Sequence, residues 1–200
     1  MNLLSATFSR RLRVPALTAL ALVLNVGAGI ANVVNAAPRI EQWTAPTGAK
    51  VHFVASHELP MVDIQVDFTA GNAVDPAGKS GLAGFTHGLL DAGAGDLDEQ
   101  AISDRSADLG MILGGSVDED RASLVLRTLS AARERDASVA LLATVLARPV
   151  FPAEVLERER VRALAGLRES LTKPAALAAR VFNAAVYAGH PYGANVDAGT

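Results

Sequence analysis

The clearest pattern along the chain is the alternation of apolar and polar residues over 62–68, which has the two-residue period of a strand with one buried face. Four less regular stretches between turn residues also favour extended structure: 42–45, 50–55, 111–117 and 121–129. The first two of these are close enough to pair as one hairpin, and the last two as another. The pattern therefore predicts antiparallel strand pairing.

Elsewhere the apolar residues recur at spacings of three and four, which indicates helices, the first of them over 79–91. Asp96 stands three residues before Glu99, a capping-box spacing that predicts a second helix running to Leu109. Three more helices are predicted over 130–147, 152–173 and 175–188. The middle one carries an apolar stripe made of Leu156, Val161, Leu164, Leu167 and Leu171.

The order of these elements, strands then helices then strands then helices, is that of an α+β domain. We expect the helices to pack on one face of an antiparallel sheet, because the alternating strand has only one apolar face. Residues 37–200 are enough for one domain with a sizeable core. With 50% hydrophobic but only 4% aromatic residues, that core should be aliphatic and rich in alanine.

The N-terminus has the pattern of a secretory signal peptide. Arg10, Arg11 and Arg13 precede an apolar run over 14–30, and small residues follow it up to Ala36. We expect a signal over 1–36 with cleavage after Ala36, and hence an exported, periplasmic protein. Two alternatives are an uncleaved anchor in the inner membrane, since about 20 apolar residues span a bilayer, and a twin-arginine signal.

Charge and cysteine content exclude several classes of function. The formal net charge is −3, so no basic surface for nucleic acid or anionic lipid is expected. The chain has no cysteine, which excludes disulfides, thiolate metal sites and a cysteine nucleophile. Contact with a membrane is expected only if the signal is not cleaved.

The segment 81–90 resembles the zinc helix of the pitrilysin and insulinase family of metallopeptidases, in which Gly-Leu-Ala precedes His-x-x-Glu-His. Further segments similar to that family are 70–76, 115–116, 148–160, 190–193 and 199–200. The resemblance covers almost all of the expected mature chain and implies a mitochondrial processing peptidase-like metallohydrolase half-domain. It also implies truncation, because the family usually continues into a second, similar domain.

The zinc motif itself is degenerate. In the family, two histidines one helical turn apart bind zinc and the glutamate between them activates the metal-bound water. The matching positions here are Gly84, His87 and Gly88, and the family's third ligand falls near Ala165 or Gly166. The resemblance therefore implies no catalytic residue, no metal ligand and no cofactor in this chain, with zinc expected in the family and in a partner.

Several interpretations of His87 and the two glycines remain open. His87 could join His52 or His57 and Asp91 in a different metal site, hydrogen-bond within the helix packing, or contact a substrate. Gly84 and Gly88 share one helix face, where a backbone or peptide could pass closely, or they could reflect drift after loss of catalysis.

The resemblance also implies a place for peptide. In the family a substrate adds as a strand to a sheet edge, and the matching residues here are Gly114, Gly115, Ser116 and Val117. The alternative is an ordinary hairpin strand in which glycine eases a bend.

Together these features predict a non-catalytic subunit of an exported pitrilysin/insulinase-type zinc metallopeptidase, which helps form the chamber and bind peptide. Its expected partners are a catalytic zinc peptidase subunit of the same family and a peptide. The alternatives are an active zinc-dependent endopeptidase with an unrecognised metal site and a purely structural assembly subunit.

Overall fold

The computed structural model describes residues 38–199, which divide into two compact units between His57 and Glu58. The predicted signal peptide and its cleavage site lie outside the described residues. In the first unit, strands β1 (Ile40–Thr44) and β2 (Lys50–Val54) pair antiparallel, with Trp43 opposite Val51. This hairpin confirms the pairing predicted from the sequence.

The second unit is built on a three-stranded antiparallel sheet in the order β3 (Met61–Phe68), β7 (Ala122–Leu129), β6 (Ile112–Val117). β7 is therefore the central strand, and β6 is an edge strand. The predicted alternation of β3 is confirmed, because Ile64 and Val66 pack against the core while the polar residues between them are exposed.

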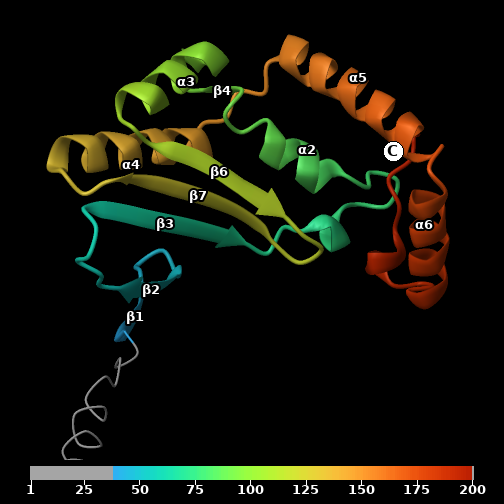
Figure 1. Cartoon of the computed structure of the whole chain (residues 1–200), viewed down its shortest axis with the longest axis horizontal. Helices are drawn as coiled ribbons and strands as arrows, with labels where there is room; N and C mark the ends of the chain where they lie inside the picture. Colours follow the sequence, from blue (N-terminus) through green and yellow to red (C-terminus); the bar gives the residue numbers. More distant parts are fainter. Residues whose placement is uncertain (1–37, 200) are drawn as a thin grey trace, which may run out of the picture. The chain divides into compact units, whose positions relative to one another are not determined.

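The core lies between this sheet and helix α4 (Ala132–Ala147), which runs along β7 (Figure 1). Leu126 of β7 and Val145 of α4 are fully buried, and the core is aliphatic as expected. At its edge Thr128 and Ser138, both buried, share a hydrogen bond of 2.9 Å, so neither hydroxyl is left unpaired. An α+β fold with helices on an antiparallel sheet is thus confirmed.

The first helix of this unit, α2 (Leu82–Gly88), is shorter than predicted. Its beginning is fixed by Asp75, whose carboxylate accepts hydrogen bonds from the backbone amides of Gly81 (2.7 Å) and Ala83 (2.9 Å). Gly81 has φ +99°, a left-handed conformation that glycine adopts readily. Residues 79–81 therefore lie outside the helix, although their composition is compatible with one.

Between α2 and helix α3 (Glu99–Asp108), strands β4 (Gly93–Ala94) and β5 (Leu97–Asp98) form a small hairpin that the sequence analysis missed. Asp96 lies in its turn, so its predicted role as the N-cap of the helix is wrong. The N-cap is Asp98, whose Oδ1 accepts a hydrogen bond of 2.8 Å from the amide of Ala101.

We expect Asp98→Ala to destabilise the domain by about 1 kcal/mol, because it leaves a first-turn amide of α3 without its acceptor. Asp96→Ala, the matched control, should change the free energy of unfolding by less than about 0.5 kcal/mol. Urea denaturation of both variants measures the difference. Equal destabilisation would contradict the assignment of the cap to Asp98.

The last two helices, α5 (Ala153–Ser170) and α6 (Pro174–Val186), begin and end within a few residues of the predicted positions. The apolar stripe on α5 is only partly covered in the described structure. Leu164 and Leu167 are half-buried, whereas the other members, Leu156, Val161 and Leu171, are exposed.

Short 3₁₀ helices, η1 (Asn72–Val74) and η2 (Pro191–Gly193), complete the unit. No helix in the described part of the chain is both long and apolar enough to cross a membrane.

Candidate functional site

The three residues of the degenerate motif lie on α2, and His87 among them makes a hydrogen bond to the sheet. His87 is half-buried, and its Nε2 lies 3.0 Å from the backbone carbonyl oxygen of Ser123 on β7. Because a carbonyl only accepts, Nε2 must carry the proton and donate. The interpretation of His87 as a hydrogen-bonding group within the helix packing is the one that the geometry supports.

The two glycines of the motif face open space. A Cβ atom built at Gly84 or at Gly88 would have no other atom within 4 Å. No backbone outside α2 in the described chain therefore passes close enough to require glycine at either position, and a Cβ atom fits at both.

The predicted position of the third family ligand, near Ala165 or Gly166, also lacks a metal-binding side chain. Ala165 and Gly166 lie on α5, are exposed, and have no side-chain atom that could bind a metal. Within residues 38–199, no group of three histidine, aspartate or glutamate side chains is placed to hold a metal ion. The residues predicted to match the family's zinc positions therefore do not fit a zinc ion.

The predicted peptide-binding residues lie on the edge strand β6, where Gly114, Gly115 and Ser116 are exposed. On one side β6 pairs with β7, and Gly115 stands opposite Leu124. No other strand of the described sheet pairs with its second side. Backbone groups on that side are thus available to a further extended chain.

Gly115 is the point where α2, β6 and β7 meet. Its φ is +158°, and a Cβ atom there would collide with the carbonyl of Ser123 and approach Nε2 of His87 to 2.5 Å. Only glycine fits this position, so β6 is held close to β7 beneath the histidine. Sequence reasoning named Gly115 and His87 but not Ser123, since a backbone carbonyl carries no sequence signal.

Charged side chains on the exposed face of the sheet are largely paired with one another. Arg127 donates two hydrogen bonds to Asp63, of 2.6 and 2.9 Å, which lowers the pKa of Asp63 and raises that of Arg127. Ser123 and Gln65 donate to Asp67, and the hydrogen bond from Ser123 is the main cause that lowers the pKa of Asp67. These carboxylates therefore stay ionised at neutral pH.

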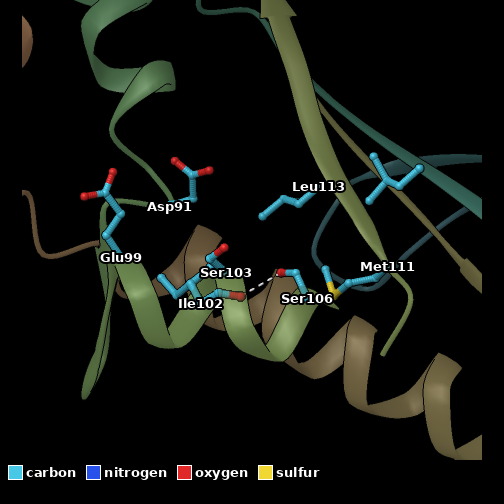
Figure 2. Close-up of a pocket in the computed structure, with 8 residues that line it drawn as sticks. Asp91, Glu99, Ile102, Ser103, Ser106, Met111 and Leu113 are labelled. Atoms are coloured by element: carbon cyan, nitrogen blue, oxygen red, sulfur yellow. Dashed lines mark hydrogen bonds between the residues drawn. The ribbon is translucent and has the colours of Figure 1, made fainter. Parts of the chain in front are cut away.

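Two cavities of about 430 Å³ each adjoin β6. One lies on the exposed sheet face between Gln65, Ile112, Val125 and the Asp63–Arg127 pair. The other lies at the start of β6, between the end of α2 and the helix α3 (Figure 2). Both could receive side chains of a peptide lying along the strand.

Replacing His87 by leucine should cost about 1–3 kcal/mol, because the carbonyl of Ser123 loses its donor in a half-buried position. His87→Gln keeps an N–H donor and should cost less. Thermal or urea unfolding of the two variants gives the comparison. Wild-type stability in the leucine variant would show that the hydrogen bond contributes nothing.

A scan against protein-family models finds no match, and a search of curated proteins finds none either. Solved structures do match. The chain is similar to the inactive domain of a peptidase M16 from Pseudomonas fluorescens, with 34% identity, a TM-score of 0.76 and coverage of 78% of this chain and 38% of that one.

Two more distant structures share the fold. Pitrilysin is 19% identical with a TM-score of 0.64, over 80% of this chain and 17% of its own. The periplasmic protease PqqL from Escherichia coli is 16% identical with a TM-score of 0.66, over 76% of this chain and 17% of its own. The chain thus spans well under half the length of each of these three structures.

Proposed function

Because this chain belongs to the pitrilysin/insulinase (M16) family of peptidases as a degenerate domain without the His-x-x-Glu-His motif, we propose that it is a non-catalytic subunit of a zinc peptidase. In this proposal it is exported to the periplasm and pairs with a catalytic subunit of the same family. It helps to close the chamber and holds peptide there.

The observation that carries the proposal is the state of the zinc positions. Gly84 and Gly88 offer no metal ligand. His87, at the position of the general base, donates its Nε2–H in a hydrogen bond to the carbonyl of Ser123. The 34% identical neighbour is itself described as an inactive domain. Hydrolysis would then depend on a partner that carries the full motif.

Peptide would be held by the edge of β6, at Gly114, Gly115, Ser116 and Val117. Strand addition uses backbone hydrogen bonds and needs no particular side chain, so it survives the loss of zinc ligands. The open edge and the two adjoining cavities support this assignment.

Co-purification from the native host tests the proposal. We expect the chain to co-purify with a motif-bearing M16 peptidase and to raise its rate of peptide cleavage. Binding without any kinetic effect would favour a structural assembly role instead, and peptide cleavage by the chain alone would overturn the proposal. Sequencing the mature N-terminus tests export, with Ala37 expected as the first residue.

A further inference from the structure

We propose that the cavity at the start of β6 is a subsite for a basic side chain, lysine or arginine, of an extended peptide, with Asp91 as the anion that binds it. This inference rests on the proposed function, because it needs a peptide on the edge of β6. It adds a preference for one class of side chain at one end of that peptide.

The cavity has walls from three parts of the fold. Figure 2 shows Asp91 after the end of α2, residues of α3 opposite it, and Leu113 reaching in from β6. Its floor is apolar, since Ile102 and Met111 are buried and Leu113 is half-buried. The site therefore combines an apolar floor with a polar rim.

Negative charge at this rim is not balanced. Among the lining residues there is no lysine, arginine or histidine. The carboxylate of Glu99 is paired, because Nη2 of Arg158 donates to both of its oxygens, at 2.9 and 3.1 Å. Asp91 is exposed and has no cationic partner in the described structure, so it leaves one uncompensated negative charge beside β6.

A basic side chain matches both the apolar floor of the cavity and the negative charge at its rim. Its aliphatic stem can cover Ile102, Met111 and Leu113 while its charged end reaches Asp91, with the Ser103 hydroxyl on the same rim as a second acceptor. A metal ion fits less well, because no three acidic or histidine side chains of the described residues converge.

Pairing with the edge strand β6 determines which side chains of a bound peptide can enter the cavity. Side chains of an added strand alternate between the two faces of the sheet, so every second one lies on the same face as Leu113. One of these, at the end of the peptide beside Ile112 and Leu113, would enter the cavity. The acidic turn of Asp118, Glu119 and Asp120 at the far end of β6 also disfavours an anionic peptide.

The test uses the purified chain and fluorescent nine-residue peptides of valine, threonine and serine, with lysine, glutamine or glutamate at one guest position moved along the sequence. At the position that reaches the cavity, lysine should bind about fivefold more tightly than glutamine, a typical size for one charge-assisted contact. Glutamate should bind more weakly than glutamine. Raising the salt concentration should reduce the lysine preference.

Variants of the chain assign the preference to Asp91. Asp91→Asn should bind the lysine and glutamine peptides equally, and Asp91→Lys should prefer the glutamate peptide. Asp96→Asn, an exposed aspartate of the nearby turn that does not line the cavity, should keep the wild-type preference. Circular dichroism checks that each variant is folded.

Failure of the subsite can be distinguished from failure of the proposed peptide-binding role. Equal binding of the three peptides to the wild type, or a lysine preference that persists in Asp91→Asn, overturns the subsite but leaves the peptide-binding role intact. Peptides with N-methyl groups on alternate residues test that role, because one of the two possible patterns must abolish strand pairing. If neither pattern weakens binding, or if no peptide binds, both the edge-strand role and the subsite are wrong.

Discussion

Gly115→Ala is expected to destabilise the domain by about 2–4 kcal/mol. Two causes act together. The φ of +158° is a conformation that side chains with a Cβ rarely adopt, and the new methyl group would collide with the carbonyl of Ser123 and crowd His87. Relief requires β6 to move away from β7 or α2 to move away from the sheet.

Gly114→Ala is the matched control, since a Cβ at that position would meet no atom within 4 Å. Alanine there should leave stability unchanged or raise it slightly, because glycine weakens a strand interior. Urea denaturation of the two variants gives the comparison. Equal free energies of unfolding would mean that the contact of Gly115 with β7 and α2 does not constrain the fold.

Most of the fold could be predicted because the sequence encodes it locally. The alternation in β3 and the three-to-four spacing in the later helices follow directly from which side chains face the core. The first helix was predicted too long and the cap of α3 was misplaced, since both depend on contacts outside a local window. Asp75 fixes the start of α2 from six residues before Gly81, and the β4–β5 hairpin takes Asp96 away from the helix.

Less of the candidate site than of the fold could be predicted from the sequence. The sequence alone shows that glycine at 84 and 88, the positions predicted to match the family's zinc ligands, has no side-chain atom that could bind a metal. The contact between His87 and Ser123 could not be predicted, since it joins residues 36 positions apart through a backbone carbonyl. Nor could the cavity beside Asp91, which forms only when α2, α3 and β6 come together.

His87 has a structural role that does not depend on metal. His87 ties α2 to the sheet at the one point where β6 must carry glycine. His87, the residue predicted to match the family's glutamate, thus ties α2 to the central strand β7, next to the edge strand that we assign to peptide. Peptide binding at the edge of β6, as we propose, does not depend on zinc ligands on α2, because strand addition uses backbone groups.

Placing histidine at the two motif positions that carry glycine should create a zinc site on α2, where we expect none in the wild type. In Gly84→His/Gly88→His the imidazoles stand one helical turn apart on one face of α2, the spacing that lets two histidines bind one zinc ion. A Cβ atom at either position meets no neighbouring atom within 4 Å, and histidine is a better helix former than glycine. His87 is retained in this variant to keep its hydrogen bond to Ser123.

Equilibrium dialysis followed by metal analysis should find about one zinc per chain in the double variant and no stoichiometric zinc in the wild type. Gly84→His/Gly88→Ala, with one histidine only, is the control and should resemble the wild type. Ala165→Glu or Gly166→Glu can then be added to the double variant. Whichever of the two places its carboxylate on the zinc ion as a third ligand should lower the dissociation constant for zinc. Stoichiometric zinc in the wild type that is lost in His87→Ala would contradict the non-catalytic assignment, because it would mean that His87 binds metal rather than the carbonyl of Ser123.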